Sequence, residues 1–506
     1  MCGFLFLERD DVQSSKDLFE KALASQAWRG PDASKIQICA KRFILGHNRL
    51  SIMDPKSESD QPMTDASDKY IIVFNGEIYN FKEIKSQLNI KTRTSSDTEV
   101  LLEAYAILGN EIFEKLDGMF SLVILNKHTN EWVAARDHLG IKPLYYAKID
   151  GNFVAASETV SIRTLFDFQV DYSSVDEWKS FRRPMPGKTY FHGIHELPPG
   201  HYIDSNGNIK CYWKLSASQK PFSQENFNIL LKDSVKSHCM SDVMVTSLLS
   251  GGLDSSVVVK LSKVKTAYTT GLTHNNEVVE SQEVANEIGI KVLPYCFSES
   301  QMESEWRRLV GIRGEPLSVP NEALISLICK EMKNEEKVVL TGEGADELLF
   351  GYDRIFNKAI NDGFDIEEFI DTYTYDSSTK ITDRMKNYIE KLWKGKTPIE
   401  FLEDFFIQFH LPGLLRRMDF SSMSASKEAR VPFVTKTLYE YMYRRQPSIK
   451  INCVESKIPL RNLLRELNVI SPLSRKKIGF SATRINKNLS DDYKDFQNIC
   501  LEELGW

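Results

Sequence analysis

Residues 243–258 read VMVTSLLSGGLDSSVV, and this stretch decides the fold of the C-terminal half of the chain. Residues 243–249 form a short apolar run of the kind that makes a buried strand. A glycine-rich turn at residues 250–252 follows at once and opens a helix. Glycine amides, serine hydroxyls and the positive end of the helix dipole would then face one point, which suits a bound anion. The stretch predicts a phosphate-binding turn between a strand and a helix.

The sequence around this turn alternates between helices and buried strands. Apolar, β-prone runs cover residues 243–249, 266–272, 292–297 and 338–341, with helical stretches between them. This alternation predicts an α/β domain with a doubly wound parallel sheet. Beyond Tyr352 the chain reads mostly as amphipathic helix, so additional C-terminal helices are expected, with loops around residues 411–435 and 470–485.

The first 205 residues follow a different pattern that is richer in strands. The β-prone runs there cover residues 36–53, 70–81, 119–126 and 131–136, with turn signals beside them. The clearest helices are residues 15–26 and 97–108, and the cap cluster Ser-Ser-Asp-Thr opens the second. The pattern indicates an α+β domain of stacked sheets with flanking helices.

Turn-forming and polar residues separate these two patterns. Pro198-Pro199-Gly200 interrupts the strand-rich part, and residues 214–225 are polar and rich in serine. A chain of 506 residues is also too long for one ordinary core. We therefore expect two domains, residues 1–210 and residues 211–506.

Composition restricts the class of protein. Hydrophobic residues make up 42% and charged residues 26% of the chain, as in ordinary globular proteins. The formal net charge of -6, without a long Lys/Arg run, argues against nucleic-acid or membrane partners. Eight cysteines without CxxC pairs indicate free thiols rather than a zinc site. With no long apolar run and no signal peptide, a cytoplasmic protein acting on small molecules is expected.

Residue types near the amino terminus favour hydrolysis of an amide. If the initiator methionine is removed, the α-amine of Cys2, with a pKa of roughly 7.7–8.0, can act as base for its own thiol. Asn75 and Gly76 can donate hydrogen bonds to an oxyanion, although this pair is also common in hairpin turns. Arg49 and Asp97 offer the two charges that a free α-amino acid needs, although Asp97 also suits a helix cap.

Acidic residues follow a second strand end, where residues 340–348 read LTGEGADEL. Asp254 in the first turn and Asp346 here are natural Mg²⁺ ligands, because Mg²⁺ prefers one or two carboxylates beside phosphate oxygens. Alone, these acids would equally suit a solvated loop. No GxxxxGK[ST] motif occurs, which argues against a P-loop that transfers the γ-phosphate. The basic residues 475–477 can offset charge on a phosphoryl group or lie on the surface.

The motifs of the first 200 residues together resemble a class II glutamine amidotransferase domain of the N-terminal nucleophile type. They are Cys2-Gly3, RGPD (29–32), Gly46-His47, RLSI (49–52), FNGEIYN (74–80), DGMF (117–120) and RDHLGIKPLY (136–145). The resemblance implies an αββα sandwich with Cys2 as nucleophile and with Asn75 and Gly76 as oxyanion donors. It assigns glutamine binding to Arg49, Asn75, Glu77 and Asp97.

The SGGLDSS turn resembles the pyrophosphate loop of ATP pyrophosphatases, and the order of motifs resembles the asparagine synthetase family across nearly the whole chain. The later motifs are GEGADE (342–347), EARVPF (428–433), KIPLR (457–461) and RKKIGF (475–480). The resemblance implies that ATP, with Mg²⁺ and without an organic prosthetic group, adenylates a carboxylate. It assigns ATP and pyrophosphate binding to Leu249, Ser250, Gly251, Gly252, Asp254, Ser255, Thr270, Gly342 and Lys477, and Mg²⁺ to Asp254 and Asp346. Glu343 would take a proton from ammonia, and Lys477 would stabilise the transition state.

Two acceptor carboxylates fit this resemblance. One is aspartate, and the other is a uronic acid or similar carboxylate in surface-polysaccharide or secondary-metabolite synthesis. Residues 314–323 (GEPLSVPNEA) depart from the Thr/Arg-containing stretch of housekeeping asparagine synthetases, and residues 432–435 (PFVT) depart from the family's PFLD. Phe350 replaces a family glycine, which would change the volume of the acceptor pocket.

Other functions fit the residues less well. A β-lactam synthetase-like ring closer needs no glutaminase, whereas Cys2 is intact and Glu343 stands where such enzymes tend to carry tyrosine. A tRNA-modifying enzyme would need a basic face, and a non-catalytic relative would lack reactive residues. We expect an amidotransferase whose partners are glutamine, ATP and an acceptor carboxylate, and the family tendency points to a homodimer.

Overall fold

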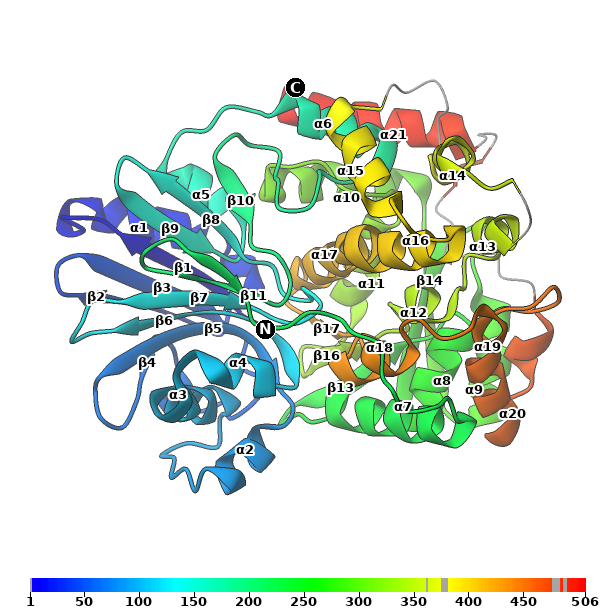
Figure 1. The fold of residues 1–506 in the computed structure, drawn as a ribbon, viewed down its shortest axis with the longest axis horizontal. Helices are drawn as coiled ribbons and strands as arrows, with labels where there is room; N and C mark the ends of the chain where they lie inside the picture. The colour runs from blue at the N-terminus through cyan, green and yellow to red at the C-terminus, as the bar shows by residue number, and fades with distance from the viewer. Residues whose placement is uncertain (1, 361–362, 375–380, 476–482, 486–488) are drawn as a thin grey trace.

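The computed structural model describes residues 2–360, 363–374, 381–475, 483–485 and 489–506. Stacked antiparallel sheets form the N-terminal half, and a parallel sheet between helices forms the C-terminal half (Figure 1). Residues 212–223, which contain neither helix nor strand, join the halves. Within the described ranges, no helix is long and apolar enough to cross a bilayer. The predicted fold class, an αββα sandwich followed by a doubly wound sheet with additional C-terminal helices, is confirmed.

Twelve strands build the two antiparallel sheets of the sandwich. The strands of the first sheet are β1 (Gly3–Glu8), β2 (Ala33–Cys39), β3 (Phe43–Arg49), β8 (Tyr145–Ile149), β9 (Asn152–Ala156) and β10 (Ile194–Glu196). Those of the second are β4 (Met63–Thr64), β5 (Tyr70–Ile78), β6 (Gly118–Asn126), β7 (Trp132–Arg136), β11 (His201–Asp204) and β12 (Ile209–Cys211). Their orders are β10-β8-β9-β1-β3-β2 and β12-β11-β7-β6-β5-β4.

Strand β1 is buried on both faces, which explains its unbroken apolar sequence. Phe4 and Phe6 point between the two sheets, while Leu5 and Leu7 point toward the outer helices. Helices α1 (Lys16–Ala24) and α5 (Thr159–Leu165) cover that outer face. On the second sheet the outer helices are α2 (Phe81–Gln87), α3 (Asp97–Leu108) and α4 (Ile112–Lys115). Helix α3 has the predicted bounds, and the Ser96 hydroxyl caps it by accepting the Thr98 N–H.

The strand order of the parallel sheet reverses between its central strands, β13 and β16. Its strands are β13 (Met244–Leu248), β14 (Thr266–Leu272), β15 (Lys291–Phe297), β16 (Glu336–Leu340) and β17 (Glu428–Arg430). The order is β15-β14-β13-β16-β17, with every pair parallel. The chain moves outward in one direction after β13 and in the other from β16, and α/β proteins bind ligands at the carboxyl edge of such a switch.

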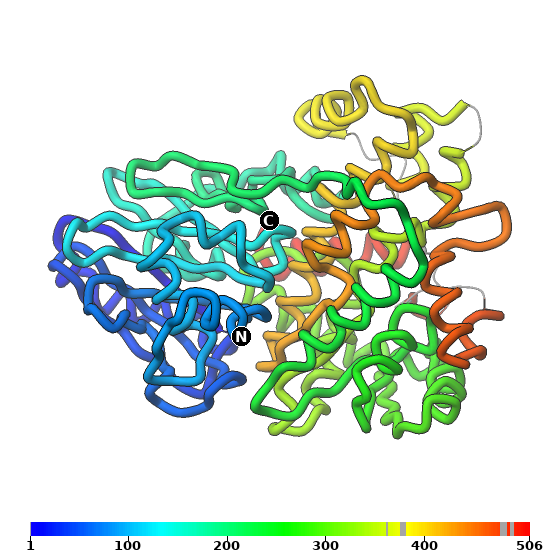
Figure 2. The backbone as a smooth tube through the Cα atoms, turned by 60° about the horizontal axis from the view of Figure 1, so that its bottom comes forward, coloured from blue at the N-terminus to red at the C-terminus, as the bar shows by residue number. Residues whose placement is uncertain are grey.

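Helices cover both faces of this sheet (Figure 1). One face carries α7 (Gln224–His238), α8 (Leu253–Ser262), α9 (Val278–Ile288), α18 (Lys436–Met442) and α20 (Ile458–Glu466). The other carries α11 (Glu322–Glu331) and α17 (Leu411–Met423). Further helices are α6 (Tyr172–Phe181), α10 (Glu299–Arg313), α12 (Ala345–Leu349), α13 (Asp353–Ile360), α14 (Ile366–Tyr373), α15 (Asp383–Trp393), α16 (Pro398–Phe405), α19 (Pro447–Lys450) and α21 (Leu489–Leu504). In Figure 2, α14–α16 lie at the outer edge of the molecule.

The prediction of a loop around residues 411–435 is wrong, because helix α17 and strand β17 occupy most of it. Pro412 and Gly413 would locally favour a break, yet the helix runs through them, since His410 and Leu411 before them have helical backbone angles. A π-helical turn, Phe406–His410, leads into α17. Of the second predicted loop, residues 471–474 form a 3₁₀ turn and residues 476–482 lie outside the described ranges.

Truncation of Phe6 tests the core between the stacked sheets. The Phe6 side chain is fully buried, and its ring centroid lies 5.7 Å from that of Trp132 and 6.2 Å from that of Phe153. We expect Phe6→Ala to lower the free energy of unfolding by about 3–5 kcal/mol. Denaturant unfolding followed by tryptophan fluorescence measures the loss. As a control, Ile107→Ala at a 57% exposed side chain should cost no more than about 0.5 kcal/mol, and equal effects of both variants would contradict this core.

Candidate active sites

The first candidate site is a small cavity of about 30 Å³ where β1, β3, β5 and α3 begin or end. Five of the residues predicted to bind or attack glutamine line it: Cys2, Arg49, Gly76, Glu77 and Asp97. The sixth, Asn75, accepts the Cys2 N–H through its side-chain oxygen at 3.1 Å. The structure thus brings together all six residues that the sequence analysis assigned to this site.

Asn75 and Gly76 are placed to bind an oxygen that gains negative charge near Cys2. The Asn75 side-chain oxygen is taken by the Cys2 N–H, whereas its amide nitrogen is buried without a hydrogen-bond partner among the described residues. Leaving a buried donor unpaired costs free energy, which a ligand oxygen would recover. At Gly76 a Cβ would lie 2.0 Å from the Met119 carbonyl oxygen, so β5 can approach β6 only with glycine here.

Opposite charges face each other across the cavity. Arg49 Nη1 donates to Asp60 Oδ1 at 2.6 Å, which holds the guanidinium at the wall. The Asp97 carboxylate accepts the N–H groups of Ile78 and Thr98, each at 2.8 Å. Burial nevertheless raises the pKa of Asp97 to about 6. A fixed cation and a fixed carboxylate in one cavity match the carboxylate and ammonium of a free α-amino acid.

Glu77 links this cavity to the other half of the chain. Its Oε1 lies 3.2 Å from Nη2 of Arg430, a residue of β17 in the parallel sheet. Burial raises the pKa of Glu77 well above its usual range, and the Arg430 charge opposes that shift. The contact shows that the EARVPF segment, identified from the sequence only as a motif, reaches the wall of the first site.

The Cys2 thiol needs a base. Burial raises its pKa, and the thiolate rather than the thiol is the nucleophile. Removal of the preceding residue would turn the Cys2 nitrogen into an α-amine on the same residue, as predicted; Met1 itself lies outside the described ranges. Arg29 Nε donates to the Cys2 carbonyl oxygen at 2.9 Å and so holds the residue from the other side. Sequence reasoning placed Arg29 in a motif but gave it no role.

The second candidate site is a cavity of about 1470 Å³ at the carboxyl edge of β13, β14 and β16. All predicted ATP-site residues within the described ranges line it: Leu249, Ser250, Gly251, Gly252, Asp254, Ser255, Thr270 and Gly342. Glu343 and Asp346 line it as well. Lys477 lies outside the described residues, while Arg475 of the same motif donates to the Gly251 carbonyl oxygen at 3.2 Å.

Hydrogen bonds within the turn before α8 fix its shape at the wall of this cavity. The Ser250 hydroxyl accepts the Gly252 N–H at 3.3 Å, and the Ser255 hydroxyl accepts the Ser250 N–H at 3.2 Å. Gly251 has a φ of +78°, a conformation that side chains other than glycine disfavour. The buried Thr270 hydroxyl has no hydrogen-bond partner in the described part of the chain. These groups and the start of α8 suit phosphate oxygens.

The two predicted Mg²⁺ ligands converge on Lys457, which the sequence analysis placed in the KIPLR motif without giving it a role. Lys457 Nζ lies 2.7 Å and 2.6 Å from the two Asp254 oxygens and 2.8 Å from Asp346 Oδ1. Both carboxylates therefore reach one small cation, and Mg²⁺ needs one or two carboxylates beside phosphate oxygens, so the residues fit the ion. No group of three His, Cys, Asp or Glu side chains within the described ranges could hold a metal without a ligand's oxygens.

Glu343, the predicted proton acceptor, is paired with an arginine that sequence reasoning missed. Arg417 Nη2 of α17 donates to Glu343 Oε2 at 2.7 Å. The neighbouring Gly342 packs against the phosphate turn, since a Cβ there would lie 2.7 Å from the Asp254 Cβ. Glu343 thus lies beside the nucleotide site. Arg417 also lines the cavity, and its Nε is buried without a hydrogen-bond partner among the described residues.

Beyond Glu343 the cavity ends in a hydrogen-bonded group that the sequence did not indicate. The Tyr352 hydroxyl donates to Glu347 and lies 3.0 Å from His410 Nε2, while the Tyr373 hydroxyl lies 2.6 Å from His410 Nδ1. Burial raises the pKa of Glu347 to about 8 and lowers that of His410 well below its usual range. His410 comes from the π-helical turn, a form that is frequent at functional sites.

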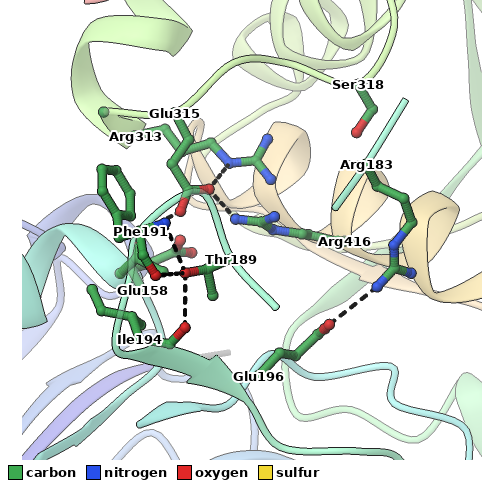
Figure 3. Close-up of polar contacts among 12 residues, drawn as sticks. Glu158, Arg183, Thr189, Phe191, Ile194, Glu196, Arg313, Glu315, Ser318 and Arg416 are labelled. Carbon is green, nitrogen blue, oxygen red and sulfur yellow. Dashed lines mark hydrogen bonds and ion pairs between the residues drawn. The ribbon is translucent and has the colours of Figure 1, made fainter. Parts of the chain in front are cut away.

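Residues 314–323, the stretch that the sequence analysis expected to differ from housekeeping asparagine synthetases, contact two parts of the structure. Glu315 is buried between Arg313 and Arg416 and accepts the Thr159 hydroxyl at 2.5 Å (Figure 3). Residues 318–321 line the large cavity and carry no charged side chain. The first part of the stretch thus joins the two halves of the chain, and the second part forms the cavity wall.

The expectation that Phe350 would change the volume of the acceptor pocket is wrong. The Phe350 side chain is fully buried and stacks on Phe356 with ring centroids 4.2 Å apart, within a hydrophobic cluster behind the cavity wall. Its φ of +57° lies in the left-handed region, which favours glycine. The ring points into the protein and not toward a substrate.

Comparison with known proteins shows the family of the chain. A glutamine amidotransferase domain model matches residues 1–213, and an asparagine synthase model matches residues 226–504. Asparagine synthetase [glutamine-hydrolyzing] 1 of Bacillus subtilis is 29% identical over 95% of this chain and 87% of the relative. A putative asparagine synthetase of Mycobacterium tuberculosis is 26% identical (89% and 82%), and a probable one of Acanthamoeba polyphaga mimivirus is 27% identical (94% and 83%). Because the asparagine synthase model covers more than half of it, the chain belongs to the asparagine synthase family and carries a class II glutamine amidotransferase domain at its N-terminus.

Proposed function

We propose that this protein is a glutamine-hydrolysing ligase that uses ATP to activate a carboxylate and converts it to an amide. One observation carries the proposal: a single chain holds a nucleophile beside charges that suit an α-amino acid, and a phosphate turn beside a carboxylate that can accept a proton. The first site alone would waste ammonia, and the second alone would lack a nitrogen donor. The pair is required for glutamine-dependent amidation.

In the first half-reaction, the Cys2 sulfur attacks the side-chain amide carbon of glutamine after its proton passes to the α-amine. Arg49 binds the substrate carboxylate, and Asp97 binds its ammonium group. The Asn75 amide and the Gly76 N–H donate to the oxyanion of the tetrahedral intermediate. Collapse of this intermediate expels ammonia and leaves a thioester, which water hydrolyses to glutamate.

In the second half-reaction, an oxygen of the acceptor carboxylate attacks the α-phosphorus of ATP, and pyrophosphate leaves. Donors of the turn at residues 250–255 bind the phosphate oxygens. Asp254 and Asp346 would hold Mg²⁺, whose charge offsets that of the phosphates. Ammonia then attacks the acyl carbon, Glu343 accepts a proton and AMP leaves. A sheltered passage between the sites is required, because ammonia in neutral water is mostly ammonium.

Two acceptors are supported by different observations. The relatives are named asparagine synthetases, and Arg417 lines the cavity with a cation that suits the second carboxylate of aspartate. The uncharged wall at residues 318–321 instead favours an acceptor with fewer charges, such as a uronic acid. The chemistry at the phosphates is the same for both.

Pyrophosphate release by the purified protein identifies the acceptor. With Mg²⁺-ATP and glutamine, we expect aspartate to stimulate release at least about tenfold over the reaction without acceptor, and asparagine to form. Free uronic acids and nucleotide-linked uronic acids form the comparison panel. Pyrophosphate release with a uronate but not with aspartate would identify a uronic acid as the acceptor. Silence with every acceptor in the panel would contradict both assignments.

Two variants separate the half-reactions. Cys2→Ala should lower glutamine-dependent synthesis by at least about 10³-fold, since the nucleophile is lost, while synthesis from ammonium chloride continues. Asp346→Asn should abolish synthesis from either nitrogen source but leave glutamine hydrolysis intact. Glutamate formation and pyrophosphate release, measured in the same samples, report both reactions. Glutamine-dependent synthesis by Cys2→Ala would show that the two-site mechanism is wrong.

Acidification should weaken glutamine binding through Asp97. Its pKa of about 6 is raised by burial, so the carboxylate loses its charge, and with it the partner of the substrate ammonium, as the pH falls through 6. We expect kcat/KM of the wild type relative to Asp97→Asn to fall about tenfold per pH unit below that value. Taking the ratio removes the contribution of the Cys2 α-amine, which titrates in both proteins. A ratio that stays constant between pH 5 and 7 would exclude this role.

A further inference from the structure

Two charged motif residues of the sandwich lie outside both sites and meet at one carboxylate of the other half. Arg29 of the RGPD motif and Lys142 of the RDHLGIKPLY motif are both fully buried. Arg29 Nη1 lies 2.8 Å from Asp419 Oδ2, and Lys142 Nζ lies 3.3 Å from Asp419 Oδ1. Asp419 belongs to α17, and its side chain is 4% exposed. The requirement to pair these buried charges fixes α17 to the sandwich.

From Asp419 the contacts continue to the nucleophile. Arg29 uses Nη1 for Asp419 and Glu158 and Nε for the Cys2 carbonyl oxygen. The guanidinium is planar and rigid, so a shift of its Asp419 end also moves the end that holds Cys2. Asp419 therefore helps to set the position of Cys2 without touching the substrate.

The same helix reaches the nucleotide site on its other side. Arg417, two residues before Asp419, donates to Glu343 beside the phosphate turn. Positions two apart on an α-helix differ by about 200° in direction, so their side chains leave α17 on opposite sides. A nucleotide that shifts Glu343 therefore acts on α17 through Arg417.

We propose that α17 couples the two active sites, with Asp419 as the positioning residue for Cys2 and Arg417 as the contact to the nucleotide site. The inference rests on the proposed function. Because coupling between two binding sites is reciprocal, a bound nucleotide must change the affinity for glutamine by the same factor as glutamine changes that for the nucleotide. The consequence is that the affinity of the first site for glutamine depends on whether a nucleotide occupies the second site.

Calorimetric titration of the Cys2→Ala protein with glutamine tests the coupling, because this variant binds but does not cleave. The titration is done with and without Mg²⁺ and an ATP analogue that has a methylene group between its α- and β-phosphorus atoms. We expect the analogue to change the Kd of glutamine at least about fivefold. In Cys2→Ala/Asp419→Asn the change should fall below about twofold, while the Kd of the analogue alone stays the same within about twofold.

Two further variants control for misfolding and for a general effect of contacts between the two halves. Adding Lys142→Met to Asp419→Asn removes one positive and one negative charge together, so this protein should fold even if the unbalanced variant does not, and it should also lose the coupling. Lys436→Met is the control, because Lys436 Nζ joins the same two halves through the Glu114 carbonyl oxygen at 2.9 Å, away from α17. This control should keep the coupling.

The outcomes separate the coupling from the proposed function. If Cys2→Ala does not bind glutamine at all, the proposed function is wrong. If it binds glutamine and the analogue leaves the Kd unchanged, the coupling is wrong. Coupling that survives in both Asp419 variants, or that is lost in Lys436→Met as well, would also overturn the role of α17.

Discussion

A charge removed from water must find a partner, and this requirement organises the contact between the two halves of the chain. Asp419 and Glu158 balance the charges of Arg29 and Lys142 in that contact, and Glu77 pairs with Arg430. Breaking one such buried pair typically costs about 3–5 kcal/mol, so alternative arrangements of the halves are strongly disfavoured. The cost of desolvation thus favours one relative arrangement of the two halves. The two sites therefore have a fixed position relative to each other.

The parallel sheet determines where the nucleotide chemistry can take place. Reversal of strand order at β13 and β16 opens a gap at their carboxyl ends, and the two glycine-bearing segments after these strands enter it. Gly342 packs directly against Asp254, which leaves no room for a larger residue. The loop that carries Glu343 is therefore held next to the phosphate turn by backbone shape and does not depend on a bound ligand.

Sequence patterns predicted those features that depend on residues close together in the sequence. The strand and turn around SGGLDSS, the bounds of α3 and the grouping of six residues around Cys2 all follow from periodicity, caps and motifs. The contacts of Arg417 and Asp419 could not be predicted, and Lys457 was placed in a motif without a role, since each of the three acts on a partner at least 74 residues away in the sequence. Helix α17 lies where a loop was predicted, because tertiary packing and a π-helical turn carry the helix through Pro412-Gly413.

Lys457 also stabilises the nucleotide site before a substrate binds. Two carboxylates facing a site without a cation would repel each other and push the surrounding segments apart, but the ammonium of Lys457 lies between them as a counter-ion of the chain's own. The phosphate turn and the acidic segment therefore keep their arrangement when no nucleotide is present. Little ordering is left to occur at the moment of binding, so less of the contact energy is lost to conformational entropy. Lys457 thus keeps the nucleotide site preorganised. The rate of nucleotide binding should therefore be limited by diffusion to the site more than by ordering of the chain around the ligand.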